Sequence, residues 1–313
     1  MVVVDQLKGR DFLCLSDYTK EEILYLLDLA AKLKEEQKQG TPHPHLQGKT
    51  LGMIFDKAST RTRVSFEVGM YQLGGMAMFM SGRDLQIGRG EPIPDTAQVL
   101  SRYIDGIMIR TFSDTMVKEL AEYASIPIIN GLTDLQHPCQ VMADFQTIIE
   151  HKGKLEGLKL AYVGDGNNMT HSLMIGAAKV GMDVAVASPE GYQPDAGVTE
   201  MTRAFADETG VNVLVTTDPA EAVADADIVY TDVWASMGQE AEQQERLQKF
   251  AGFEVNEALM QKARPDALFM HCLPAHRGEE VSAGVIDGPR SVVFDQSENR
   301  LHAQKAILVA VMK

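Results

Sequence analysis

Short apolar runs alternate with segments of helical length along almost the whole chain, and this alternation constrains the fold more than any other feature. In the first half the apolar runs are residues 51–55, 76–80, 106–109 and 126–129. In the second half they are residues 158–163, 184–187, 213–215, 228–231 and 268–270. Strands that alternate with helices form parallel sheets covered by helices on both faces. The pattern predicts an α/β protein made of parallel, doubly wound sheets.

The length of 313 residues fits two domains of about 150 residues each. A polar stretch that contains a glycine, residues 151–154, separates the two sets of strands. We therefore predict one domain over residues 1–150 and another over 151–295. The last segment, about 296–313, has a helical composition and is expected to pack back on the first domain.

Charge and composition exclude several classes of protein. Lysine and arginine total 29 against 44 acidic residues, a net charge of −15 that argues against a nucleic-acid-binding surface. A few local arginines can still bind a small anion. The longest apolar run, 306–312, is too short to span a membrane, and the first residues lack a signal-peptide core. Three scattered cysteines favour a reducing compartment, so we expect a cytoplasmic protein without a nucleic-acid or membrane partner.

Polar or reactive residues follow five of the predicted strands. In open parallel sheets, ligands bind at the carboxyl ends of the strands. Five such groups at equivalent ends predict an active site in a cleft between the two sheets. The groups begin at Asp56, Arg110, Gly164, Asp232 and His271.

The segment Ser59-Thr60-Arg61-Thr62-Arg63 is the most specific of these features. Apolar residues after it indicate that a helix begins here, and the free N–H groups of a helix N-terminus favour an anion. The hydroxyls add donors, and a guanidinium suits phosphate. The alternative is an ordinary cap with solvated arginines. Because the chain has no Walker-type loop, a small phosphorylated substrate fits better than ATP.

A second helix is predicted to begin at His137-Pro138-Cys139-Gln140, since proline suits the first helical position. A neutral His137 in the first turn can donate to a carbonyl oxygen and polarise it, although it could also be a simple capping residue. Cys139 invites a nucleophile hypothesis with His137 or His271 as the base, but its spacing matches no nucleophile motif.

The stretch Gly164-Asp165-Gly166-Asn167-Asn168 begins like a dinucleotide-binding fingerprint. Met169 stands where the third glycine is needed, which argues against a nicotinamide cofactor. The paired asparagines instead offer donors and acceptors to an amino acid.

Two further segments carry candidate groups. Asp232, four residues before Ser236-Met237-Gly238, could hold a substrate ammonium group or serve as a turn residue. The loop that begins His271-Cys272-Leu273-Pro274 could offer ligands to zinc, but no second cluster completes the coordination. We therefore expect neither a metal nor a cofactor, and a buried, inert Cys272 is the simpler alternative to a functional one.

Taken together, these motifs resemble the aspartate/ornithine carbamoyltransferase family over almost the whole chain. Residues 59–63, Arg110 and 137–140 are similar to the family's carbamoyl-phosphate contacts. Asp232 with 236–238, and 271–274 with Arg277-Gly278, resemble the ornithine branch. The resemblance implies an enzyme of class EC 2.1.3.3, which transfers the carbamoyl group of carbamoyl phosphate to the δ-amine of L-ornithine. The products are L-citrulline and phosphate, in arginine biosynthesis.

The resemblance also implies roles for individual residues. It assigns catalysis to Arg61, Arg110, His137, Asp232 and Cys272. Its carbamoyl-phosphate contacts are Ser59, Thr60, Arg61, Thr62, Gln86, Arg110, His137, Pro138, Cys139, Gln140, Cys272, Leu273 and Arg300. Its ornithine contacts are Asn168, Asp232, Ser236 and Met237, with Asn167 as an alternative to Asn168. Gln86 resembles the residue lent to a neighbouring subunit, which implies a homotrimer.

Three alternatives remain open on the sequence. The acceptor could be aspartate or an acylated ornithine, which a substrate panel distinguishes. The chain could be a nicotinamide dehydrogenase, which cofactor fluorescence would reveal. It could also be a non-catalytic amino-acid-binding protein that binds ornithine but releases no phosphate.

Overall fold

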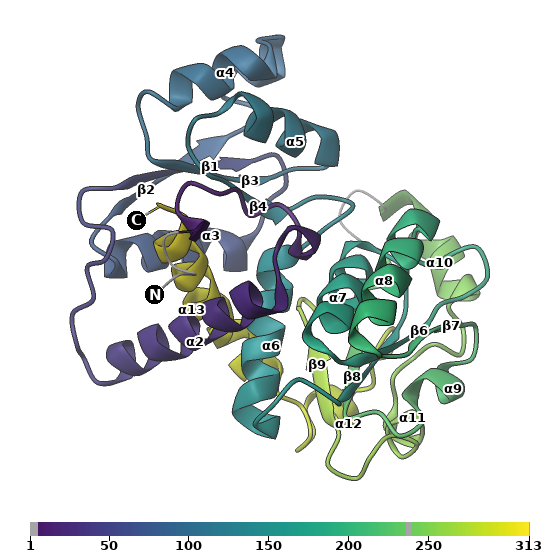
Figure 1. Ribbon diagram of the computed structural model, residues 1–313. Coiled ribbons are helices and arrows are strands. Elements are labelled where there is room, and N and C mark those ends of the chain that lie inside the picture. Colours follow the sequence, from purple (N-terminus) through teal and green to yellow (C-terminus); the bar gives the residue numbers. More distant parts are fainter. Residues whose placement is uncertain (1–5, 236–239, 313) are drawn as a thin grey trace. The chain divides into compact units, whose positions relative to one another are not determined.

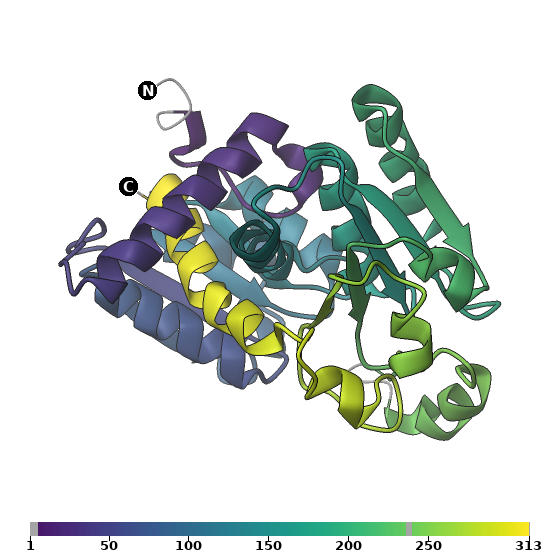
Figure 2. The ribbon, with the colours of Figure 1, turned by 90° about the horizontal axis from the view of Figure 1, so that it is seen from below.

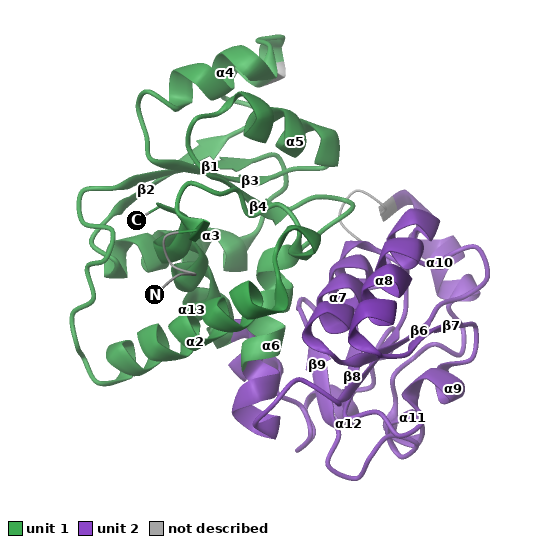
Figure 3. Ribbon diagram, viewed as in Figure 1, with its two compact units in different colours: residues 1–146, 298–313 green, residues 147–297 purple. Residues whose placement is uncertain are grey.

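The computed structural model describes residues 6–235 and 240–312. In it the chain forms two compact units, residues 1–146 with 298–313 and residues 147–297 (Figure 3). The division between the units falls inside α6 (Pro138–Lys152) and α13 (Val293–Met312), and the predicted division at residue 150 falls inside α6 as well.

The first unit contains a four-stranded parallel sheet in the order β2-β1-β3-β4. The strands are β1 (Thr50–Phe55), β2 (Met76–Ser81), β3 (Gly106–Arg110) and β4 (Ile128–Leu132). Along the chain the helices are η1 (Leu15–Asp17), α2 (Lys20–Lys38), α3 (Thr60–Gln72), η2 (Gln86–Arg89), α4 (Ile93–Leu100) and α5 (Asp114–Tyr123). Figure 1 shows α4 and α5 on one face of this sheet and α2, α3 and α13 on the other.

The C-terminal helix packs within this first unit, beside α2 (Figures 1 and 2). Lys34 of α2 donates from Nζ to Oδ1 of Asn299 over 2.8 Å in a buried bond. Lys305 is fully buried and donates to the side-chain oxygens of Gln37 and Gln72 and to Nε2 of His43 over 2.9–3.1 Å. These bonds tie residues near the end of the chain to helices formed near its beginning.

The second unit contains a five-stranded parallel sheet in the order β7-β6-β5-β8-β9. The strands are β5 (Lys159–Val163), β6 (Asp183–Ala187), β7 (Val213–Thr216), β8 (Ile228–Thr231) and β9 (Leu268–His271). The helices are α7 (Asn168–Val180), α8 (Ala196–Thr209), α9 (Pro219–Val223), η3 (Glu240–Glu242), α10 (Gln243–Lys249), α11 (Glu257–Met260) and α12 (Ala283–Ile286). Residues of α9, α11 and α12 share a buried core with β5, β8 and β9.

These sheets confirm the predicted α/β class, and most strand ends differ from the prediction by one residue or none. The exception is β4, predicted at 126–129, which begins later because Pro127 has no N–H to donate. It continues through Asn130 and Gly131 to Leu132, beyond the predicted end at residue 129. A Cβ at Gly131 would lie 2.5 Å from Sδ of Met108, so close strand packing explains the glycine.

Helix caps follow the local sequence. Thr19 and Glu22 form a capping box at the start of α2. Among the described residues, no helix has the length and apolar character needed to cross a membrane.

Candidate active site

The strand order of each unit places the predicted polar residues at a topological switch point, where neighbouring strands connect in opposite directions. In the first unit this point lies between β1 and β3, so the residues after Phe55 and those around Arg110 are adjacent. The backbone N–H of Asp56 donates to the oxygen of Arg110 over 2.9 Å, and Oγ1 of Thr111 donates to Oδ2 of Asp56 over 2.6 Å. The switch point therefore joins two of the five predicted groups.

A helix, α3, begins within residues 59–63 as predicted, and Ser59 is its N-cap. Its Oγ accepts from the backbone N–H of Thr62 over 3.2 Å, which leaves other N–H groups of the first turn for an anion. Thr60 is exposed and Arg61 half-buried, whereas Thr62 is buried. The start of α3 thus offers both a helix dipole and a nearby guanidinium to a negatively charged group.

Arg300 of α13 joins the first turns of α3 and α6. Its Nη2 donates to Oγ1 of Thr62 over 3.0 Å, and its Nη1 donates to Oε1 of Gln140 over 2.6 Å. Nε2 of Gln140 in turn donates to Oδ1 of Asp144 over 2.9 Å. All four side chains are buried, so this network fixes a positive charge where two helix N-termini meet.

His137 lies in this positive environment, directly before Pro138, the first residue of α6. Burial and the charges of Arg300, Arg110 and Arg61 lower the pKa of His137 well below its ordinary value of 6.5. The imidazole is therefore neutral at physiological pH. A neutral imidazole can donate one hydrogen bond to a carbonyl oxygen without adding another charge.

Cys139 does not have the environment of a nucleophile. It is fully buried, its Sγ donates to the backbone oxygen of Asn130 over 3.3 Å, and burial raises its thiol pKa to about 12. A thiol in this state is not a thiolate at neutral pH. Its side chain stabilises the connection between α6 and β4.

A cavity of about 500 Å³ adjoins the start of α3. Its lining includes Ser59, Thr60, Arg63, Ser81 and Arg83, so two hydroxyl-bearing residues of the predicted anion loop face a space with two arginines. Both arginines come from the same unit as the loop.

Lys57 is a buried cation that the sequence reasoning missed. It forms a hydrogen-bonded ion pair with Asp134, and its Nζ lies 4.2 Å from the ring centroid of Phe112. In the sequence, a lysine between a strand and an anion loop does not by itself indicate a buried cation. Its burial is decided by the loop after β4, which supplies Asp134.

In the second unit the switch point lies between β5 and β8 and brings Asn167 to Asp232. Nδ2 of Asn167 donates to Oδ2 of Asp232 over 2.9 Å, while its Oδ1 caps α7 by accepting from the N–H groups of Met169 and Thr170. The amide of Asn167 is thus engaged in the fold. Asn168, the first residue of α7, is half-buried beside it.

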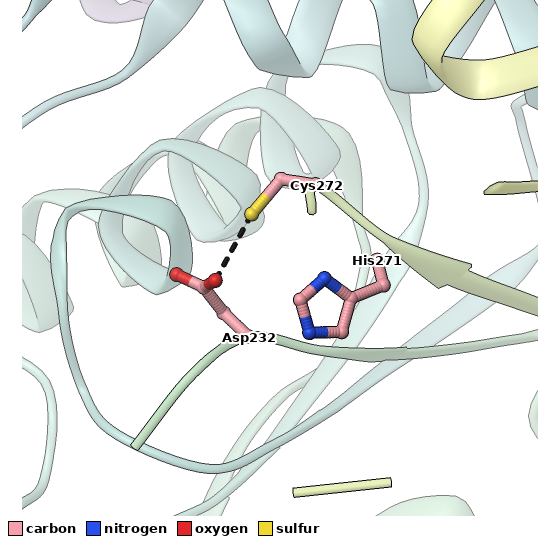
Figure 4. A group of neighbouring side chains, drawn as sticks. All are labelled: Asp232, His271 and Cys272. Atoms are coloured by element: carbon pink, nitrogen blue, oxygen red, sulfur yellow. Dashed lines mark hydrogen bonds between the residues drawn. The ribbon is translucent and has the colours of Figure 1, made fainter. Parts of the chain in front are cut away.

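Cys272 contacts the same carboxylate, that of Asp232 (Figure 4). Its Sγ donates to Oδ1 of Asp232 over 3.0 Å. The parallel pairing of β8 with β9, with Thr231 opposite His271, places the next residue of each strand side by side. The buried Asp232 carboxylate thereby receives bonds from an amide, a thiol and the N–H of Val233.

Asp232, His271 and Cys272 also have ligand atoms within 4.8 Å of one another, a grouping that could hold a metal ion. Both ring nitrogens of His271 are engaged, however. Nδ1 accepts from the N–H of Leu273 over 2.8 Å, and Nε2 lies 3.2 Å from Oε1 of Glu280. A metal would have to displace one of these bonds, so the geometry does not favour a metal centre.

The sequence reasoning also missed the buried ion pair between Asp165 and Arg246. Nη1 of Arg246 donates to Oδ2 of Asp165 over 2.8 Å and to the backbone oxygen of Trp234 over 2.7 Å. Burial raises the pKa of Asp165 to about 6, since desolvation outweighs the attraction of Arg246. The partner lies on α10, and nothing local in the sequence indicates the pairing.

The remaining predicted residues have different environments. Gln86 is exposed at the start of η2, and Leu273 is half-buried with a positive φ of 58°. Ser236 and Met237 lie outside the described residues. The geometry thus groups Ser59, Thr62, Arg110, His137, Gln140 and Arg300 in one unit, and Asn167, Asn168, Asp232 and Cys272 in the other.

Comparison with known proteins identifies the family. Residues 10–150 match the family model "Aspartate/ornithine carbamoyltransferase, carbamoyl-P binding domain", and residues 156–311 match the "Asp/Orn binding domain" of the same family. The ornithine carbamoyltransferase of Anoxybacillus flavithermus is 65% identical over 312 residues, covering 100% of this chain and 99% of the relative. The relative from Pyrococcus furiosus described as anabolic is 58% identical and covers 99% of this chain and 98% of its own length.

Solved structures agree with these sequence matches. The structure of ornithine carbamoyltransferase from Pyrococcus furiosus superposes with a TM-score of 0.95 at 59% identity, covering 98% of each chain. The anabolic ornithine carbamoyltransferase from Campylobacter jejuni gives a TM-score of 0.90 at 41% identity, covering 96% of this chain and 97% of its own. With both family domains matched in order along nearly its full length, this chain belongs to the aspartate/ornithine carbamoyltransferase family.

Proposed function

We infer that the chain is an ornithine carbamoyltransferase, EC 2.1.3.3. It transfers the carbamoyl group of carbamoyl phosphate to the δ-amine of L-ornithine and yields L-citrulline and phosphate, as in arginine biosynthesis. The observation that carries this assignment is the buried array of Thr62, Gln140 and Arg300 at two helix N-termini, beside a neutral His137. Such an array suits a phosphorylated carbonyl compound.

Carbamoyl phosphate binds in the first unit. The N–H groups at the start of α3, the hydroxyls of Ser59, Thr60 and Thr62 and the guanidinium of Arg61 hold the phosphate. Arg110, Arg300 and Gln140 extend the donor array, and Pro138 and Cys139 contribute backbone atoms near His137. His137 donates to the carbonyl oxygen. These donors stabilise the oxyanion of a tetrahedral intermediate, which is where preorganised dipoles lower the barrier most.

Ornithine binds in the second unit. Asp232 is the counter-charge for an ammonium group, and Asn168 offers an amide to the amino-acid backbone, with Ser236 and Met237 as further contacts. The δ-amine must be neutral to attack, yet an alkyl amine has a pKa of about 10.4 in water. The site therefore selects the unprotonated amine. Cys272 and Leu273 lie at the reacting nitrogen, and Cys272 acts together with Asp232.

In the transfer itself, the amine nitrogen forms a bond to the carbamoyl carbon, and the bond from that carbon to the phosphate oxygen breaks. The nitrogen gives up one proton as the ureido group of citrulline forms. The leaving phosphate takes the electron pair of the broken bond and accepts this proton, so that it leaves as hydrogen phosphate. Positioning and fixed donors supply most of the acceleration, without a covalent enzyme intermediate. Water must be kept from the carbamoyl donor during this step.

We also propose that the enzyme is a cytoplasmic homotrimer in which Gln86 enters a neighbouring active site. Support comes from the outer side of α3 and β2, where apolar side chains are exposed. Their exposed fractions are 51% for Val64, 36% for Val68, 81% for Tyr71, 53% for Met76 and 43% for Met78. A patch of this kind is typical of a protein interface. None of the three cysteines, all of which lie among the described residues, forms a disulfide, and this fits a reducing compartment.

A colorimetric citrulline assay on the purified protein tests the assigned function. Carbamoyl phosphate is supplied with L-ornithine, L-aspartate or an N-acylated ornithine in parallel, and released phosphate is measured alongside. We expect citrulline and phosphate in equal amounts with L-ornithine only. Carbamoylation of another acceptor, or no turnover in folded protein, would contradict the proposal.

A further inference from the structure

A fully buried glutamine, Gln304, lies one helical turn after Arg300 on α13. Figure 2 shows this helix between α2 and α3. Most residues of α13 after Arg300 are apolar, and a fully buried position in such a helix favours an apolar side chain. A buried amide costs free energy unless its oxygen and its nitrogen both form hydrogen bonds. The amide of Gln304 forms both, and its partners lie in the first unit.

The neighbouring groups define the orientation of this amide. The nitrogens of the Arg300 guanidinium can only donate, so the oxygen of Gln304 faces them and accepts from Nε over 3.2 Å and from Nη2 over 3.1 Å. The hydroxyl proton of Ser65 points toward the backbone oxygens of Arg61 and Thr62, which lie 2.7 and 3.2 Å from Oγ. Oγ of Ser65 therefore accepts from the amide nitrogen of Gln304, 2.5 Å away.

These bonds fix the plane of the guanidinium. The terminal nitrogens of Arg300 bind two residues of the proposed carbamoyl-phosphate site, Thr62 through Nη2 and Gln140 through Nη1. Gln304 binds the edge formed by Nε and Nη2. Because one oxygen accepts from both atoms, the plane cannot rotate about the bond between Cδ and Nε without lengthening the bond to Nη2. Gln304 thereby sets the direction in which the terminal nitrogens point.

The amide gives this support without a charge of its own. A carboxylate in the same place would accept the same two bonds, but it would also offset the positive charge of Arg300. A neutral acceptor leaves that charge available to a phosphate group. The amide nitrogen, bound to Ser65, also ties the guanidinium to the first turns of α3, where Thr62 lies.

We propose that Gln304 is a positioning residue for the binding of carbamoyl phosphate. It holds the guanidinium of Arg300 in the plane that serves Thr62 and the phosphate together, and it leaves the positive charge undiminished. This inference rests on the proposed function for the identity of the ligand. The affinity for that ligand can be measured without ornithine and without turnover.

The variant Gln304→Leu removes both hydrogen-bonding groups at similar volume. We expect the Kd for carbamoyl phosphate, measured by isothermal titration calorimetry, to rise about fivefold, because the guanidinium of Arg300 is no longer held in its plane. KM for carbamoyl phosphate should rise with it, whereas KM for ornithine should change by less than about twofold. A Kd within about twofold of the wild-type value in folded Gln304→Leu would overturn the proposal.

Lys305→Met is the matched control for a general loosening of α13. Lys305 is the next residue along the helix, is also fully buried, and binds Gln37, His43 and Gln72. We expect this variant to unfold at a lower temperature and to keep the Kd for carbamoyl phosphate within about twofold of wild type. An equal rise of Kd in both variants would mean that loosening of the helix explains the effect, and the proposal would be wrong.

A double-mutant cycle tests whether Gln304 acts through Arg300. The ammonium group introduced by Arg300→Lys has no plane to orient, so adding Gln304→Leu to it should change Kd by less than about twofold. If Gln304→Leu raised Kd about fivefold in that background as well, the two effects would be independent and the proposal would be overturned.

Gln304→Glu tests the importance of a neutral acceptor. The carboxylate retains the acceptor for Nε and Nη2 of Arg300 but adds a negative charge beside the phosphate, so Kd should rise more than in Gln304→Leu. A wild-type Kd would contradict the role assigned to the uncharged amide.

Circular dichroism and thermal unfolding establish that each variant is folded. If Gln304→Leu does not fold, Gln304→Met replaces it with the same expected values. A wild-type protein that binds carbamoyl phosphate but forms no citrulline would refute the assigned function and leave the result on Gln304 intact. A wild-type protein that binds no carbamoyl phosphate would refute both.

Discussion

Arg300 binds Thr62 across 238 residues of sequence, with Nη2 of the guanidinium 3.0 Å from the threonine Oγ1. The same guanidinium binds Gln140 through Nη1, so one side chain of the C-terminal helix fixes the first turns of two helices. In the amide orientation that satisfies its hydrogen bonds, the side-chain oxygen of Gln304 accepts from Nε of Arg300 over 3.2 Å and from Nη2 over 3.1 Å. The carbamoyl-phosphate contacts that we propose therefore depend on where the last helix packs.

Arg300→Lys should separate charge from geometry at this point. Lysine keeps the positive charge but cannot reproduce the planar fork that serves Thr62 and Gln140 together. We expect KM for carbamoyl phosphate to rise about tenfold or more, with a smaller change in KM for ornithine. Steady-state kinetics with each substrate varied in turn measure the two KM values. Arg290→Lys, which alters an arginine bound to the backbone oxygen of Met260, is the control and should behave as wild type.

Arg61→Gly should lower kcat far more than it lowers stability. Arg61 is half-buried in the first turn of α3, where it can contact the departing phosphate. Loss of one transition-state donor costs about 100-fold or more in kcat, whereas glycine in a helix costs only about 1 kcal/mol of stability. Thermal unfolding and citrulline formation give the two quantities. Near-normal turnover would remove this loop from the mechanism, and the exposed Arg203→Gly in α8 provides the control for helix destabilisation.

Asp232→Ala should impair the use of ornithine while leaving carbamoyl-phosphate binding largely intact. The carboxylate accepts bonds from Asn167, Val233 and Cys272 in the second unit, so its loss leaves three donors unsatisfied and removes a counter-charge. Isothermal titration calorimetry with carbamoyl phosphate, followed by kinetics in ornithine, measures both effects. If a folded variant lost carbamoyl-phosphate binding as strongly as it lost the use of ornithine, the assignment of the substrates to separate units would be contradicted.

Stability should change with pH through Asp165. Burial raises its pKa in the folded protein to about 6 from 3.8, so between these values the folded state binds more protons than the unfolded state. The contribution of Asp165 to stability is therefore complete below pH 3.8 and is lost as pH rises through about 6. The change amounts to at most about 3 kcal/mol.

Asp165→Asn removes this titration. We expect the difference in unfolding free energy, variant minus wild type, to increase between pH 4 and pH 6, in about the range that the shifted pKa defines. Urea unfolding at a series of pH values measures it. Asp287→Asn, at an exposed carboxylate whose pKa is lowered by Arg277, should lack this increase. A constant difference for Asp165→Asn across the range would mean that the carboxyl group ionises as it does in water.

Local sequence determined the elements and many of their ends. The short apolar runs of the strands, the capping box of Thr19 and Glu22, the Ser59 cap and Pro138 at the start of α6 depend only on neighbouring residues, and all are present. Side chains that follow strand ends were also predictable, because parallel strands share the direction in which their carboxyl ends point. Val64 and Val68 of α3 are more exposed than a simple amphipathic pattern predicts.

Tertiary structure decided which of these groups meet. Arg246 binds Asp165, which lies 81 residues earlier in the sequence, and Glu280 contacts His271 from a separate turn. Such pairs depend on strand order and helix packing, which arise from burying apolar surface over the whole chain and leave no periodic trace near either partner. The sequence alone therefore determined which chemical groups the enzyme presents, whereas the fold decided which protonation state and orientation each group adopts.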